Sequence, residues 1–214
     1  MERLTANNIK ELLLSLAGFY EEKKEELSSY DAVVGDGDHG TTLARGFSAG
    51  EKAVEDMKSD EPGIYLKSFG RSMMGAMGGA VGPLFGSIFT ELSKACAGKK
   101  EMGLEEFSNG FGEGLLKVME LGGAVPGDKT MVDALEPAVL ALKEARGKNL
   151  SLSEGMKAAA LAAEQGMKAT ILMPAKKGRS KYLREKSVGY QDAGATSTCC
   201  LFQQTSQFIC GREE

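Results

Sequence analysis

The residues of this chain best suited to chemistry gather in one short stretch, residues 31–40, which reads DAVVGDGDHG. It holds Asp31, Asp36 and Asp38 together with His39, the only histidine of the protein. Carboxylates this close in sequence repel one another unless a cation or exposure to water separates them. Carboxylate oxygens without a cysteine pair or a second histidine are typical of a site for a hard cation, Mg²⁺ or Ca²⁺, and not of a zinc site.

The spacing of the aspartates distinguishes between these two cations. A calcium-binding EF-hand loop that opened at Asp36 would need Asp or Asn at its fifth position and Glu at its twelfth. Those positions hold Gly40 and Phe47, so the EF-hand template does not apply. Mg²⁺ commonly takes a few carboxylates and completes its shell with water and substrate phosphates. The stretch therefore favours a magnesium and phosphate site, with a water-exposed acidic turn as the alternative.

Composition places the chain among soluble globular proteins. Its 214 residues are 42% apolar and 26% charged, enough to bury a sizeable core. The net charge of −4 does not favour a nucleic-acid partner, and no apolar run reaches the roughly 18 residues of a membrane span. The four cysteines show no CxxC spacing and the N-terminus shows no basic-then-apolar signal. We expect a reduced, cytoplasmic protein with free buried thiols.

Helical periodicity runs through most of the sequence. It predicts helices over residues 5–27, 41–58, 62–77, 83–97 and 104–121, around 132–142, from Ser151 or Ser153 to about 171, and over 195–208. Glu154 stands where a capping box with Ser151 would place it. No window alternates as a strand does. Because the connections are short, the prediction is an all-α, single-domain barrel or bundle of eight antiparallel up-and-down helices spanning residues 1–214.

Alternate connections of such a bundle lie at the same end. One set of alternate connections comprises the aspartate stretch, the glycine-rich turns 75–82 and 122–130, and the irregular segment 174–194. The connections of the other set are plain polar turns. We therefore expect four dissimilar segments to meet at one rim, where helix N-termini offer free N–H groups for a phosphate. Close helix packing would also explain the glycine-rich turns.

The segment 174–194 contains a basic run, residues 176–186, which reads KKGRSKYLREK. Such a run is often only a solvated charged face. Next to three aspartates at a shared rim, it would supply cations to phosphate oxygens. Arg179 is the preferred residue because a guanidinium binds phosphate with two hydrogen bonds. His39 is as readily a polar contact at a helix end as a contact to a ligand.

Taken together, these motifs resemble the L subunit of dihydroxyacetone kinase, the DhaL or Dak2 domain family. The resemblance rests on GDGDHG at 35–40, GGA at 78–80, GPLFG at 82–86, GDKT at 127–130, KGR at 177–179, YL at 182–183, QD at 191–192 and GATS at 194–197. It runs from the first helix nearly to the C-terminus. It implies a barrel of eight antiparallel helices with nucleotide and Mg²⁺ at one end.

The resemblance also implies roles for single residues. Asp31, Asp36 and Asp38 would bind two Mg²⁺ ions that bridge the phosphates of ADP or ATP, with Arg179 and His39 as the catalytic residues. The nucleotide would be bound by His39, Gly40, Thr41, Thr42, Ala80, Val81, Gly122, Met131, Arg179, Asp192, Ala193 and Gly194. Val81, Thr42 and Ala193 stand where the family commonly has Ser, Asn and Pro, which leaves a related triose or tetrose open as the sugar.

The implied activity is that of a kinase subunit that works only with partners. It would pass a phosphoryl group to dihydroxyacetone held on a separate K subunit. In one family variant ADP stays bound as a cofactor and a phosphohistidine M subunit rephosphorylates it; in another, ATP is an exchangeable substrate. A homodimer is compatible with either variant. The alternative from another class is a non-catalytic nucleotide-binding module that senses phosphorylation state.

Overall fold

Nine α-helices and one short strand pair make up the regular structure of residues 3–212, the part of the chain that this computed structural model describes. The predicted all-α class is confirmed. Residues 1–2 and 213–214 of the predicted domain lie outside the described part. The helices are α1 Ala6–Glu22, α2 Lys24–Val34, α3 His39–Val54, α4 Pro62–Ala76, α5 Val81–Ala95, α6 Leu104–Gly122, α7 Val132–Gly147, α8 Leu152–Ala169 and α9 Ala193–Cys210.

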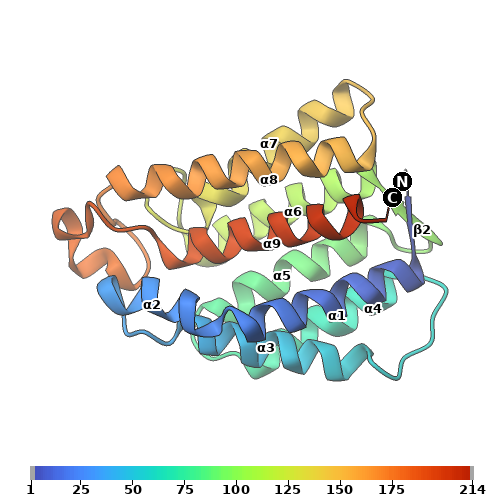
Figure 1. Cartoon of the computed structure of the whole chain (residues 1–214), viewed down its shortest axis with the longest axis horizontal. Helices are drawn as coiled ribbons and strands as arrows, with labels where there is room; N and C mark the ends of the chain where they lie inside the picture. The colour runs from blue at the N-terminus through green and yellow to red at the C-terminus, as the bar shows by residue number, and fades with distance from the viewer. Residues whose placement is uncertain (1–2, 213–214) are drawn as a thin grey trace.

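The long helices lie side by side along the length of the molecule (Figure 1). Helices that follow one another in sequence pack together, as α4 does on α5 and α7 on α8, and α1 packs against α3, α4 and α9. Both termini lie at one end of this bundle, and α2 and the connection between α8 and α9 lie at the other (Figure 1). That connection holds only short 3-10 helices, Thr170–Leu172, Arg179–Tyr182 and Arg184–Ser187, which agrees with the predicted loss of periodicity.

The predicted first helix, residues 5–27, is wrong as a single element, because α1 and α2 meet at Lys23. The buried stripe of α1 ends at Tyr20, and the next buried residue is Leu27 in α2. No glycine or proline marks the break. It is a tertiary effect: α2 turns away from the line of α1 to pack on α3 and α9. This turn carries Asp31 to the end of the bundle away from the termini.

A short antiparallel sheet, β1 Arg3–Thr5 paired with β2 Glu101–Gly103, corrects the expectation that the chain has no strand. Leu4 and Met102, the central residues of the two strands, are fully buried, and Gly103 is buried beside them. Strands of three residues are too short to show an alternating pattern in sequence. The sheet joins the start of α1 to the start of α6 at the end that holds the termini.

Several predicted local features are confirmed. Ser151 caps α8, with Glu154 completing the capping box, and Pro62 opens α4. All four cysteines are free; Cys96 and Cys199 are buried, whereas Cys200 and Cys210 are only partly buried.

An aromatic cluster forms the middle of the core and reaches towards α9. The ring of Tyr20 stacks on Phe47 with 3.9 Å between centroids, and Phe47 makes edge contacts with Phe69 and Phe89. The Tyr20 hydroxyl donates a 2.6 Å hydrogen bond to the carbonyl of Ser197 in α9. The core is therefore coupled to the first turns of α9.

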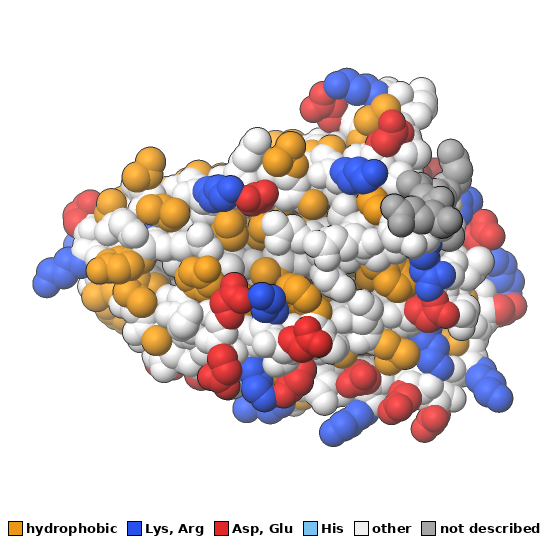
Figure 2. Space-filling view, in the orientation of Figure 1, with side chains coloured by type: hydrophobic (Ala, Val, Ile, Leu, Met, Phe, Trp, Pro, Cys, Tyr) orange, Lys and Arg blue, Asp and Glu red, His pale blue; other side chains and the backbone are white. Residues whose placement is uncertain are grey.

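The surface mixes both signs of charge. Figure 2 shows acidic and basic side chains spread over the face in view, with hydrophobic side chains gathered towards the end that carries α2 and the α8–α9 connection. None of the described helices is long and apolar enough to cross a bilayer.

Gly40 fixes the close approach of α2 and α3. A Cβ built there would lie 1.9 Å from the carbonyl oxygen of Lys24 in α2. We expect Gly40→Ala to lower the free energy of unfolding by about 2 kcal/mol or more, because the backbone of α2 must move. The matched control is Gly18→Ala in α1, where a Cβ meets nothing within 4 Å. It should raise stability by about 0.5–1 kcal/mol, since alanine is the better helix former. Urea unfolding measures both, and equal effects would contradict the proposed contact.

Candidate functional site

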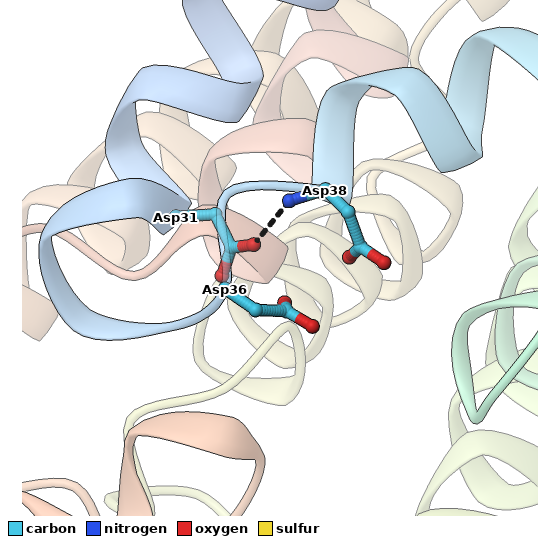
Figure 3. A group of neighbouring side chains, drawn as sticks. All are labelled: Asp31, Asp36 and Asp38. Carbon is cyan, nitrogen blue, oxygen red and sulfur yellow. Dashed lines mark hydrogen bonds between the residues drawn. The ribbon is translucent and has the colours of Figure 1, made fainter.

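Asp31, Asp36 and Asp38 converge where α2 passes into α3 (Figure 3). Each offers one carboxylate oxygen, and these oxygens lie within 4.8 Å of one another. Asp31 is buried in the last turn of α2, Asp36 lies in the connection, and Asp38 is the N-cap residue of α3. The carboxylates of Asp36 and Asp38 point to the same side of the loop (Figure 3).

The backbone of residues 35–38 is shaped around the carboxylate of Asp31. Oδ2 of Asp31 accepts hydrogen bonds from the backbone N–H groups of Asp38, at 3.1 Å, and His39, at 3.3 Å, and so caps α3. Gly35 leaves room for this carboxylate, because a Cβ there would lie 2.0 Å from Oδ1 of Asp31. Gly37 adopts a φ of 75°, a left-handed conformation that favours glycine.

Burial, together with the neighbouring negative charge, raises the pKa of two of the carboxyl groups. For Asp31 the largest cause is burial, which the hydrogen bond from His39 N–H opposes. For Asp38 burial is again the first cause, the negative charge of Asp36 adds to it, and the Arg179 guanidinium opposes it. The charged forms are therefore penalised, and a bound cation would remove that penalty. Three hard oxygens at this separation fit Mg²⁺.

The acidic cluster forms part of the wall of a cavity of about 1100 Å³. Residues from the four connections that were expected to share a rim line this one cavity. It therefore brings together all the predicted site residues except Gly40 and Thr41. The predicted residues that line it are Asp31, Asp36, Asp38, His39, Thr42, Ala80, Val81, Gly122, Met131, Arg179, Asp192, Ala193 and Gly194.

Gly40 and Thr41 are not among the residues that line the cavity, and their place at the nucleotide stays a prediction. Gly40 faces α2, and Thr41 is exposed, with its hydroxyl donating a 2.9 Å hydrogen bond to the Asp38 carbonyl. The direction in which each side chain leaves α3 explains why these two residues do not line the cavity. Because α3 begins at His39, residues three apart share a face, so His39 and Thr42 line the cavity and the two residues between them do not.

Arg179 forms an ion pair with Asp36 across the cavity. It opens the 3-10 helix Arg179–Tyr182, directly after Gly178 with its φ of 68°. Lys177 and Lys181 line the same cavity. The basic segment thus faces the acidic cluster, as the shared rim predicted.

His39 is buried and held between two helices. Its Nε2 lies 2.9 Å from the hydroxyl of Ser197 in α9. Burial lowers the pKa of His39 to about 4, so the imidazole is neutral near pH 7. His39 thus joins α3 to α9, and the catalytic role that the resemblance implies for it stays a prediction.

Arg45 lines the cavity although no motif singled it out. Its Nε donates a 2.9 Å hydrogen bond to the carbonyl of Ala76, the last residue of α4. It lies one helical turn after Thr42 and two after His39, on the same face of α3. With the helix start placed at His39, the spacing from His39 and Thr42 would have identified Arg45 from the sequence.

A family model and individual relatives identify the same family of proteins for this chain. Residues 33–207 match the DAK2 domain family. The ADP-binding subunit DhaL of the PEP-dependent dihydroxyacetone kinase of Escherichia coli (strain K12) is 36% identical over 94% of this chain and 95% of its own length. The D-erythrulose kinase of Mycolicibacterium smegmatis is 36% identical over 81% of this chain, which spans 30% of that protein.

A solved structure shares the fold. The dihydroxyacetone kinase from C. freundii in complex with AMP-PNP and Mg²⁺ superposes with a TM-score of 0.70 at 27% identity. The match covers 95% of this chain and 33% of that one, so the likeness concerns about a third of the larger protein.

The buried state of His39 predicts its titration. Between about pH 6.5 and 4 the folded protein binds fewer protons than the unfolded chain, so this residue's contribution to stability is lost as the pH falls through that window, by about 3 kcal/mol. His39→Gln, which keeps a donor and an acceptor but does not titrate there, should lack this part of the pH dependence. Because the chain has one histidine, proton NMR follows its imidazole directly. A midpoint near 6.5 would contradict the buried geometry.

Proposed function

This chain belongs to the DAK2 domain family, and we propose that it is the nucleotide-binding subunit of a kinase for dihydroxyacetone or a related triose or tetrose. The observation that carries the proposal is the convergence of Asp31, Asp36 and Asp38 on a cavity that Arg179 enters from the opposite segment. The relative in Escherichia coli is named an ADP-binding subunit, and the C. freundii kinase is solved with AMP-PNP and Mg²⁺, which supports the same ligand class here.

The acidic cluster would hold Mg²⁺, two ions as in the family that the sequence resembles. Asp36 and Asp38 present their carboxylates together (Figure 3), and Asp31 contributes one carboxylate oxygen while its Oδ2 also accepts from the N–H of Asp38. Bound Mg²⁺ would neutralise charge on the phosphates. The chain's own contribution is to keep the three carboxylates converged, through the cap on α3 and the space left at Gly35.

The rest of the cavity suits a nucleotide. The start of α5, where Ala80 is the N-cap, and the start of α9, with Ala193 and Gly194, both lie on its wall and offer backbone N–H groups to phosphate oxygens. Val81 lacks the hydroxyl common in the family, so its backbone N–H would make that contact. Apolar side chains also line the cavity and would contact a base, among them Leu84, Val118, Met131 and Val132.

Phosphoryl transfer depends mainly on positioning and on neutralising charge. Arg179, exposed and opposite the acidic cluster, would donate to the phosphate being transferred. The cavity surroundings also favour a protein partner that brings the sugar: Leu172 and Tyr182 are 79% and 82% exposed at the same end of the molecule. We propose a K-type subunit as that partner, with either bound ADP recharged by a phosphohistidine M-type subunit or exchangeable ATP as the donor.

The test of this function has two steps. Purified protein is first titrated with ADP and Mg²⁺ by calorimetry, and any nucleotide released on denaturation is identified. Labelled phosphoryl transfer to dihydroxyacetone is then measured with and without a K-type subunit. We expect nucleotide binding by the chain alone and transfer only with the partner. Efficient transfer by the chain alone would reject the partner requirement, and binding without transfer under any condition would favour a regulatory module.

Asp36→Asn tests the metal site. It should weaken Mg²⁺-dependent nucleotide binding by about 100-fold or more, because it removes a charged ligand. The free energy of unfolding of the metal-free protein should stay the same or rise, since carboxylate repulsion is relieved and the exposed pair with Arg179 contributes little, about 0–1 kcal/mol. The matched control is Asp60→Asn, which breaks an exposed pair with Lys100 outside the cavity. Unchanged nucleotide affinity in Asp36→Asn would exclude the assigned role.

A further inference from the structure

Lys129 is only 1% exposed, which is unusual for a lysine. It lies in the connection between α6 and α7 and has a φ of 61°, a left-handed conformation that side chains rarely adopt. Asp133 holds this turn, because its carboxylate accepts hydrogen bonds from the N–H groups of Gly127, at 2.6 Å, and Thr130, at 2.8 Å. The turn thus directs the side chain of Lys129 inward, although the left-handed backbone conformation costs free energy.

The ammonium of Lys129 lies among four backbone carbonyl oxygens. Nζ donates to those of Thr170 at 2.8 Å, Met173 at 3.1 Å, Ser187 at 2.8 Å and Tyr190 at 2.6 Å. Two of these residues precede the basic run 176–186 and two follow it. One ammonium therefore bonds both ends of the segment that connects α8 to α9.

The ammonium and the carbonyls depend on one another. A buried cation needs compensating dipoles or charge, and four carbonyl oxygens pointing at one place need a donor there. Asp192, at the start of α9, lies close to Lys129; burial raises the pKa of this carboxyl to about 7, and the ammonium of Lys129 opposes that rise. Because the site is buried, water cannot replace either the ammonium or the carbonyl oxygens as a hydrogen-bond partner.

The basic run itself makes few bonds to the rest of the protein: Lys176 N–H donates to the Asp128 carbonyl at 3.1 Å, and Arg179 pairs with Asp36. Between residues 176 and 186 only Ser180 is buried, and the rest of the run is exposed or half-buried. Further bonds lie at its base, where Ala175 N–H donates to the Ser187 hydroxyl at 2.8 Å and Gly189 N–H to the Ile171 carbonyl at 2.8 Å. Figure 1 shows this segment extending beyond the ends of the long helices. Its order is therefore set at its base, where Lys129 bonds, and not by packing of its tip.

We propose that Lys129 is a positioning residue, whose ammonium closes the base of the 170–190 segment and thereby holds Arg179 over the acidic cluster. The effect on ligand binding rests on the proposed function; closure of the segment does not.

Limited trypsin digestion tests the closure directly. The run 176–186 contains six lysine and arginine residues, so opening of the segment creates cleavage sites that mass spectrometry identifies. In Lys129→Met, cleavage within the run should be about tenfold faster or more, with sites in the helices unchanged, because cleavage follows the population of the open state. If this variant does not fold, Lys129→Gln, which keeps two donors, takes its place with the same expectation.

The matched control is Lys10→Met. The Lys10 ammonium also donates to two backbone carbonyls, those of Glu55 at 2.6 Å and Met57 at 3.1 Å, but in the connection between α3 and α4. Its loss should leave cleavage of the run 176–186 at the wild-type rate. Unchanged cleavage of the run in the Lys129 variant, or equal acceleration at every site in the chain, would overturn the proposal.

A double-mutant cycle tests the link to Arg179. The dissociation constant for ADP with Mg²⁺ is measured for wild type, Lys129→Met, Arg179→Ala and the double variant. If the segment of Lys129→Met is closed for a tenth of the time, its affinity falls about tenfold. The double variant should bind no more weakly than Arg179→Ala, since Lys129 acts through that residue.

The outcomes separate the two proposals. Independent, additive losses of affinity would reject positioning through Arg179, even with the trypsin result as expected. Absence of ADP binding in the wild type would reject the proposed function, and the trypsin digestion would still decide whether Lys129 closes the segment.

Discussion

Three carboxylates with oxygens within 4.8 Å of one another resist being brought together, and the surrounding structure is arranged to hold them. Two unit charges 4 Å apart near a protein surface interact by about 4 kcal/mol. The net stability of a domain is about 5–15 kcal/mol, so such repulsion must be offset locally. Here the first N–H groups of α3 bond Asp31, and Arg179 pairs with Asp36. Gly35 and Gly40 supply the close approaches without which α2 and α3 could not bring the aspartates together.

The position of the acidic cluster relative to the rest of the cavity depends on a series of buried hydrogen bonds. His39 bonds the Ser197 hydroxyl, which also donates to the Gly194 carbonyl at 3.0 Å. The carbonyl of Ser197 in turn accepts from Tyr20, which stacks on Phe47 in the core. The first turns of α3 and α9 are therefore fixed to each other and to the aromatic cluster. Because burial keeps the His39 imidazole neutral near pH 7, this series of hydrogen-bonded groups contains no buried charge.

The sequence predicts which segments meet, because that follows from topology: alternate connections of a helical bundle share an end, whatever the details of packing. It does not predict the break at Lys23, since Glu and Lys are good helix formers and only the contacts of α2 with α3 and α9 decide it. The exclusion of Gly40 and Thr41 from the cavity follows from a helix start at His39, two residues earlier than the periodicity indicates. Element boundaries thus limited the assignment of single residues more than the fold did.

Lys129 illustrates a different limit. It belongs to a recognisable motif, GDKT, but lysine is normally a surface residue, and its four carbonyl partners lie 41 to 61 residues further along the chain. No local pattern specifies that backbone carbonyls from both ends of an irregular segment will converge on one point. Such a site becomes visible only when the path of the segment is known.

The two sides of the cavity are held in different ways, and this difference suits phosphoryl transfer. The aspartates lie at or between the facing ends of α2 and α3, whereas Arg179 lies on an exposed run whose hydrogen bonds are concentrated at its base. The pair between Arg179 and Asp36 is 63% and 40% exposed at its side chains, so exchanging Asp36 for a phosphate oxygen costs little. In the proposed function, well-fixed carboxylates would hold Mg²⁺, and a guanidinium kept within reach but weakly bound would neutralise charge on the phosphate as it moves from donor to acceptor. An arginine locked into a buried ion pair could not do so without leaving a charge uncompensated.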